Sequence, residues 1–113
     1  MCVLRLCTTA MLVAFLPFSA AFAQTVQVTL HDGSIEPTVI ESTKGQEVRI
    51  SVQNRGTTVH NLVIPDFYVF TQNLQPGGQV NVKFTPDKTG TFPFYSDKKG
   101  IPESGMRGSV HVR

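Results

Sequence analysis

The stretch VRISVQ, residues 48–53, alternates strictly between apolar and polar side chains. Because successive side chains of an extended chain point to opposite faces, this pattern predicts a strand with one buried and one solvated face. The same alternation occurs before it in residues 26–31 and after it in residues 80–85. These three segments therefore predict half-buried strands that share one core.

Further strands are predicted at short spacing along the rest of the chain. Residues 60–64, 91–95 and 108–112 are candidates, 38–41 is a shorter one, and clusters of Gly, Pro, Asn and Asp separate them. Residues 66–74 remain unassigned. The pattern predicts an all-β fold, a single antiparallel Greek-key β-sandwich over residues 26–113. Its expected core is Val28, Val48, Ile50, Val52, Leu62, Val82, Phe84, Phe92, Phe94 and Val110.

The first 23 residues have the pattern of a cleaved secretory signal. Arg5 precedes the apolar run 11–16, Pro17 ends that run, and Ala21 and Ala23 supply the small residues that a signal peptidase reads. A membrane anchor is the alternative, but the apolar run is shorter than the roughly 20 residues needed to span a bilayer. We expect residues 1–23 to be a signal peptide, residues 24–113 to be the mature domain, and its location to be periplasmic or secreted.

Composition excludes several classes of function. Both cysteines, Cys2 and Cys7, lie in the predicted signal, so the exported domain should contain no disulfide. The net charge of +2 and the absence of a long basic run give no support for a nucleic-acid partner. Ser96, His60 and Asp97 are of the residue types that form a catalytic triad, but no nucleophile-elbow pattern surrounds the serine. We therefore expect no enzymatic activity.

The C-terminal stretch TFPFYSDKKGIPESGMRGSV, residues 91–110, contains the most informative side chains. Ser96 shares a strand face with Phe94, so it should point into the end of the sandwich. Met106 precedes the last predicted strand and can point back to the same end. His60 opens another strand at the edge of its core face. Three side chains from separate strands can therefore converge at one pole.

Residues 24–113 resemble the cupredoxins, which are small exported blue-copper β-sandwiches. The resemblance extends over nearly the whole of this region and predicts a cupredoxin-like domain. It is carried by the segments 35–40 (IEPTVI), 44–48 (KGQEV), 54–61 with its histidine, 74–77 (LQPG), 84–86 (FTP), 90–95 (GTFPFY) and 105–108 (GMRG).

The resemblance implies a copper site that has lost half of its ligands. The family's first ligand is a histidine at the position of His60, and its cysteine, histidine and methionine ligands correspond here to Ser96, Ile101 and Met106. A blue-copper centre requires a thiolate and two imidazoles, whereas a hydroxyl is a poor ligand for Cu(I) and isoleucine donates nothing. We therefore expect a degenerate site with His60 and Met106 as the retained metal ligands and Ser96 and Ile101 as lost positions.

Other residues have two interpretations at this stage. Asp97 or Glu103 could supply an auxiliary carboxylate ligand if the last loop places one of them near His60 and Met106. His60 could instead be a hydrogen-bonded polar residue of the pole, and Met106 a flexible core filler. Asn61 resembles the asparagine that ties the ligand loops together in the family, but it could also be an ordinary turn-capping amide.

Two hypotheses about function follow. In the first, the protein binds or handles copper, mainly as Cu(I), through His60 and Met106 without acting as a blue-copper electron carrier. In the alternative, it is a metal-free protein-interaction module of the cell envelope, which docks an envelope protein through its apolar pole and the basic pair Lys98-Lys99. Under either hypothesis we expect a monomer that contacts no nucleic acid and inserts into no membrane after signal cleavage.

Overall fold

The computed structural model describes residues 23–113, so the predicted signal segment lies outside the described residues except for Ala23. The described part contains nine strands and one short 3-10 helix, and no α-helix. In chain order these are β1 Gln24–His31, β2 Ser34–Glu36, β3 Val39–Ser42, β4 Val48–Asn54, β5 Val63–Ile64, η1 Pro65–Phe67, β6 Val69–Phe70, β7 Gln79–Phe84, β8 Gly90–Lys98 and β9 Ile101–Val112.

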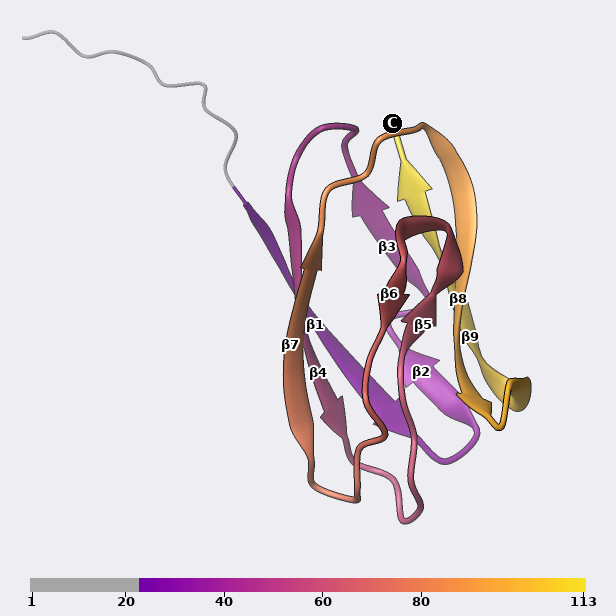
Figure 1. Ribbon diagram of the computed structural model, residues 1–113. Helices are drawn as coiled ribbons and strands as arrows, with labels where there is room; N and C mark the ends of the chain where they lie inside the picture. Colours follow the sequence, from indigo (N-terminus) through magenta and orange to yellow (C-terminus); the bar gives the residue numbers. More distant parts are fainter. Residues whose placement is uncertain (1–22) are drawn as a thin grey trace, which may run out of the picture.

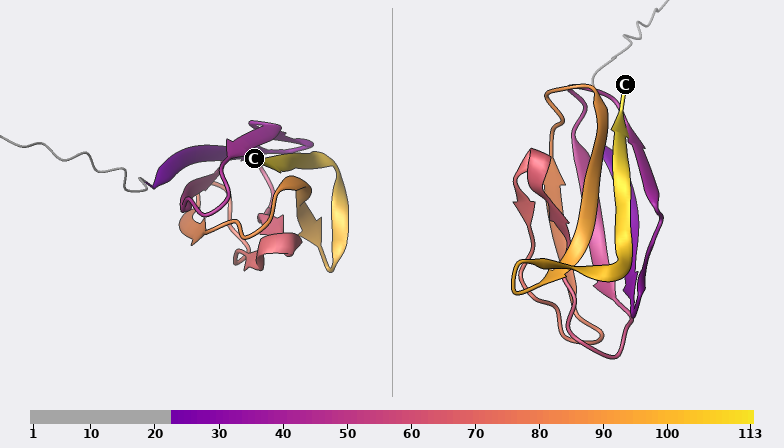
Figure 2. Two further views of the ribbon diagram at one scale, coloured as in Figure 1. Left: turned by 90° about the horizontal axis from the view of Figure 1, so that it is seen from above. Right: turned by 90° about the vertical axis from the view of Figure 1, so that its right-hand side faces the viewer.

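The strands form two sheets packed face to face (Figures 1 and 2). One sheet has the order β2-β1-β4-β7, and the other has the order β3-β9-β8-β5-β6. The predicted all-β sandwich is therefore confirmed. The alternation explains the two-faced strands of this sandwich: in β4, the even-numbered positions are buried, and the odd-numbered positions are partly or fully exposed.

The prediction that all strands are antiparallel is wrong for two pairings. β1 runs parallel to β4, and β3 runs parallel to β9. Parallel neighbours need a crossover connection, because a tight hairpin can only return the chain in the opposite direction. Residues 32–47 provide that crossover between β1 and β4, since β3 within them pairs with the other sheet.

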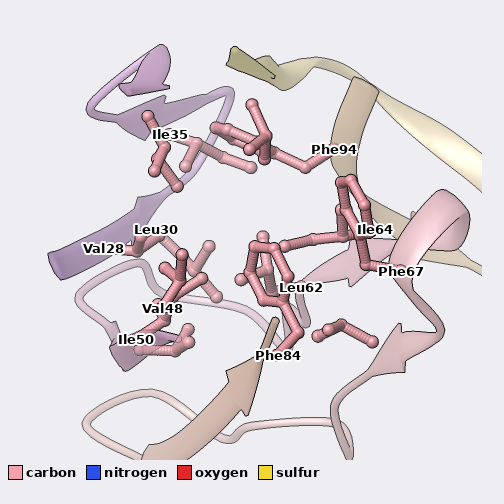
Figure 3. Packing of buried hydrophobic residues seen from close by; sticks show 14 of the residues in the cluster. Val28, Leu30, Ile35, Val48, Ile50, Leu62, Ile64, Phe67, Phe84 and Phe94 are labelled. Carbon is pink, nitrogen blue, oxygen red and sulfur yellow. The ribbon is translucent and has the colours of Figure 1, made fainter. Parts of the chain in front are cut away.

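The core lies between the sheets and largely matches the prediction (Figure 3). Eight of the ten expected residues are buried, while Val82 and Phe92 are half-buried and pack against the cluster. Residues outside the expected list also belong to the core, among them Leu30, Ile35, Ile40, Ile64, Phe67, Met106 and Val112. The buried interior is therefore continuous from sheet to sheet.

The end of the sandwich opposite the C-terminus gathers four connections (Figure 1). They are the β1–β2 turn, the segment between β4 and β5, the segment between β6 and β7, and the β8–β9 hairpin. We call this end the ligand pole, defined by His60, Asn61, Ser96 and Glu103. It brings together segments that are far apart in the sequence.

Candidate functional site

His60 lies inside the ligand pole, in the connection from β4 to β5. Its backbone N–H donates to the carbonyl of Leu74 at 3.1 Å, and the N–H of Leu74 donates back at 2.8 Å. This isolated bridge fixes the backbone on both sides, so the side chain is directed inward and is only 2% exposed. The expected strand over residues 60–64 is shorter, because only Val63–Ile64 pairs as a strand.

Two carboxylates hold the imidazole of His60 from opposite sides. Nδ1 lies 2.9 Å from Glu103 Oε2, and Nε2 lies 2.8 Å from Asp32 Oδ1. A carboxylate oxygen accepts hydrogen bonds, so both ring nitrogens face acceptors. Each nitrogen is therefore engaged by a carboxylate, and neither is open to a metal ion.

Glu103 occupies the centre of the ligand pole. Its Oε2 accepts a hydrogen bond from Ser96 Oγ at 2.6 Å in addition to the one from His60, and its Oε1 lies 3.5 Å from Lys98 Nζ. The side chain is 13% exposed. The sequence suggested Glu103 only as an auxiliary ligand, yet its Oε2 atom is hydrogen-bonded to both His60 and Ser96.

Ser96 and Asn61 connect β8 to the segment that carries His60. Ser96 is fully buried, as its strand parity suggested, and its Oγ accepts the backbone N–H of Asn61 at 3.0 Å. The side-chain amide of Asn61 donates to Asp97 Oδ1 at 2.8 Å, while its Oδ1 accepts the N–H of Asp97 at 2.8 Å. Asn61 therefore links the β4–β5 connection to β8, and the Asp97 carboxylate accepts one of the hydrogen bonds of this link.

The hairpin between β8 and β9 determines where the remaining two expected ligand positions, Ile101 and Met106, lie. Lys99 and Gly100 both have positive φ, which is typical of the two-residue turns that connect adjacent strands. The expected last loop is thus a continued hairpin, in which Ile101 pairs with Lys98 and is 69% exposed. Met106 lies further along β9 and is 1% exposed within the core. The structure brings His60, Ser96 and Glu103 together and leaves Ile101 outside.

Asp32 is the site residue that the sequence analysis missed. It lies in the β1–β2 turn, where it reads as an ordinary turn-forming residue, and it is 28 positions from His60 in the chain. Its carboxylate also accepts the backbone N–H and the hydroxyl of Thr57 at 3.0 and 2.6 Å. No local pattern signals these contacts, because they join different connections of the sandwich.

These residues do not fit the copper ion of a blue-copper centre. The position expected for the thiolate is a hydroxyl that donates to a carboxylate, the position expected for the second imidazole is exposed, and both nitrogens of the first imidazole are occupied by carboxylates. Within residues 23–113 there is no group of three or more His, Cys, Asp or Glu side chains arranged to hold a metal ion. The donor set therefore lacks the soft thiolate that this chemistry requires.

The contacts of the two carboxylates lower their pKa values. For Asp32, the hydrogen bonds from the Thr57 side chain, His60 and the Thr57 backbone hold the pKa far below its ordinary value. For Glu103, burial acts to raise the pKa, but hydrogen bonds from Ser96 and His60 and the charges of His60 and Lys98 outweigh it and lower the pKa. Both groups are therefore ionised at neutral pH.

Stability should fall with acidification because of these two groups. A carboxylate whose pKa is depressed by folding contributes stability above its unfolded pKa of about 4, and this contribution is lost as pH falls through the folded pKa. We expect the urea midpoint to drop steeply below about pH 4, and to drop less in Asp32→Asn/Glu103→Gln. Urea titrations from pH 7 to about pH 2 measure this. Parallel curves for the two proteins would contradict the assignment.

The sandwich and its altered ligand pole define a relative of the copper-binding β-sandwiches. Residues 4–112 match the family model of the cupredoxin-like domain, so the chain belongs to that family. No curated protein sequence matches the chain. Within the described part of the chain there is no helix with the length and apolar character needed to cross a membrane.

Several solved structures are similar to the chain in fold. The NMR structure of a copper-binding protein in its apo form is 27% identical with a TM-score of 0.65, and the match covers 80% of this chain and 88% of that one. Reduced auracyanin from Roseiflexus castenholzii is 20% identical with a TM-score of 0.67, covering 83% and 99%. The metal-binding domain of the Cu(I)-exporting ATPase CopA from Streptococcus pneumoniae is 17% identical with a TM-score of 0.67, covering 80% and 86%.

Proposed function

We propose that this chain is an exported, non-catalytic, cupredoxin-like protein that functions as a metal-free interaction module of the cell envelope. One observation carries the proposal: the Glu103 carboxylate engages both His60 and Ser96, at 2.9 and 2.6 Å. A metal ion bound at these two side chains would have to displace this carboxylate. The pole is therefore satisfied internally and has no electron-transfer role.

The β8–β9 hairpin supplies a surface on which a partner protein can dock. Its tip presents the exposed Ile101 beside the basic pair Lys98-Lys99. A hollow next to it is lined by Val59, Asn73, Asp97, Lys98 and Lys99. An apolar side chain beside two lysines suits a partner with acidic residues next to an apolar one, because complementary charge guides association.

Copper handling is the second candidate, and one observation favours it. His60 and Met106, the two retained family ligands, are both almost fully buried. An imidazole and a thioether are a donor pair that Cu(I) accepts. In this function the protein would store or transfer Cu(I) without a redox cycle.

Metal content distinguishes these candidates. We expect wild-type protein purified after export to contain well under one copper per chain, to lose a competition with a Cu(I) chelator, and to show no intense blue band with Cu(II), because it has no thiolate ligand. The volume-conserving variant Met106→Leu and the exposed-site control His111→Ala should behave as wild type does. Stoichiometric copper that Met106→Leu loses and His111→Ala keeps would establish copper handling instead.

A further inference from the structure

The two family ligand positions that meet in the ligand pole have the opposite hydrogen-bonding polarity from metal ligands. A metal ligand offers a lone pair, whereas Ser96 Oγ and His60 Nδ1 each present a proton. Both protons point at the same atom, Glu103 Oε2. The centre of the pole is therefore built to receive negative charge.

We propose that this centre is an anion site and that the carboxylate of Glu103, carried on β9, is its resident ligand. The inference rests on the proposed metal-free function and specifies what takes the place of the ion. The site would accept a small carboxylate of external origin if the chain's own carboxylate were removed.

Charge and burial support an anion at this position. The ring of His60 is 2% exposed and Ser96 is fully buried, so both donors act where water screens little. Lys98 Nζ adds a positive charge 3.5 Å from Glu103 Oε1. Asp32 balances the other side of the ring, but it bonds Nε2 and leaves Nδ1 to the site. Without Glu103, the buried ring of His60 would lose the acceptor at Nδ1, and Ser96 Oγ would keep only the longer contact to Asn61 Oδ1 at 3.2 Å, which is costly.

The geometry also explains why an external carboxylate could substitute. Truncating Glu103 to alanine removes the carboxylate and one methylene group but leaves both donors in place, because each is fixed by other contacts. Ser96 Oγ is held by the N–H of Asn61, and the His60 backbone is held by Leu74. Formate has the same charged head as the lost side chain and is small enough for the space it vacates.

Chemical rescue of Glu103→Ala tests the proposal in the full chain. We expect the thermal midpoint of the variant to fall by roughly 5–15 °C, because the buried His60 ring loses the acceptor at Nδ1 and Ser96 Oγ loses the shorter of its two acceptors. Sodium formate should then raise the midpoint by roughly 5 °C at a concentration tenfold above its Kd, relative to sodium chloride at equal ionic strength. Formate should not raise the midpoint of the wild type, since the site is filled.

The matched control is Glu36→Ala, which also removes a glutamate from a histidine. Glu36 lies 3.5 Å from His31, but its side chain is 73% exposed, so its loss creates no enclosed site and formate should have no specific effect. Ser96→Ala/Glu103→Ala lacks one of the two donors and should be rescued less than Glu103→Ala. Equal formate effects in all three variants would overturn the anion site.

A second variant covers the case in which Glu103→Ala does not fold in either salt. Glu103→Gln keeps the shape but loses the charge, and with its carbonyl oxygen toward His60 and Ser96 its amide N–H₂ faces Lys98 Nζ, so its midpoint should fall below that of the wild type. A wild-type midpoint would overturn the proposal. The two levels of inference fail separately: bound copper in wild-type protein contradicts the proposed function, whereas metal-free protein without rescue contradicts only the anion site.

Discussion

Gly105→Ala should lower the free energy of unfolding by about 2–5 kcal/mol. Gly105 lies on β9 between Glu103 and Met106 and has a φ of +77°, a region that L side chains rarely adopt. In addition, a Cβ at this position would collide with the backbone carbonyl oxygen of Gly33. A backbone atom cannot move aside like the end of a flexible side chain, so the β1–β2 turn would have to shift.

The matched control is Gly100→Ala in the β8–β9 turn. Gly100 has a similar φ of +82°, but a Cβ there would meet no atom within 4 Å. The control should therefore lose only the conformational part, about 1–2 kcal/mol. Urea titrations of both variants measure the difference. Equal losses would show that the close approach of Gly105 to Gly33 contributes nothing.

The consequence of Gly105→Ala should extend into the ligand pole. Gly33 follows Asp32 in the β1–β2 turn, and Asp32 holds Nε2 of His60. A displaced turn would lengthen that hydrogen bond. We therefore expect the acid sensitivity of the variant to decrease along with its stability, because the carboxylate loses the contacts that depress its pKa.

Phe94→Ala should destabilise the domain by about 3–5 kcal/mol. Phe94 is fully buried between the sheets, and it points into the core with Ile35 and Ile64 (Figure 3). Its ring also fills the space that a Cβ at Gly108 would need. Removing the ring leaves a cavity that both sheets line, and two packed sheets cannot collapse around it without losing their register.

Phe70→Ala is the control for this prediction. Phe70 lies on the two-residue edge strand β6 and is 64% exposed, so its truncation removes little buried surface. We expect a change within about 0.5 kcal/mol, which is usual for surface positions. Thermal unfolding of both variants gives the comparison. A loss in Phe70→Ala as large as that in Phe94→Ala would mean that β6 is packed more tightly than its exposure indicates.

The strands were predictable because their information is local. The alternation in residues 48–53 needs no knowledge of the rest of the chain to tell which side chains are buried, and β4 carries these side chains as expected. The direction of pairing was not predictable in this way. β1 and β4 are parallel because the intervening β3 joins the other sheet, which depends on the whole topology.

The ligand pole was only partly predictable. Parity placed Ser96 on the same face as Phe94, and the structure shows it fully buried. The position of Ile101 was inferred from family spacing that assumes a loop, whereas the Lys99-Gly100 turn continues β8 directly into β9. The turn reverses the chain earlier than a loop would, which carries Ile101 away from His60 and brings Glu103 toward it.

Most of the strands, most of the core and the absence of a thiolate from residues 24–113 follow from the sequence alone, because each of these depends on residue type or on neighbours along the chain. The surroundings of His60 follow only from the packing of the whole fold. Asp32 lies in the β1–β2 turn, 28 positions from His60, and Glu103 lies on β9, 43 positions from it. Both carboxylates reach the His60 ring only because separate connections pack together at this end of the sandwich. Hydrogen bonds between distant segments leave no periodic pattern, so no local reading of the sequence could show that an imidazole at this pole is held between two carboxylates.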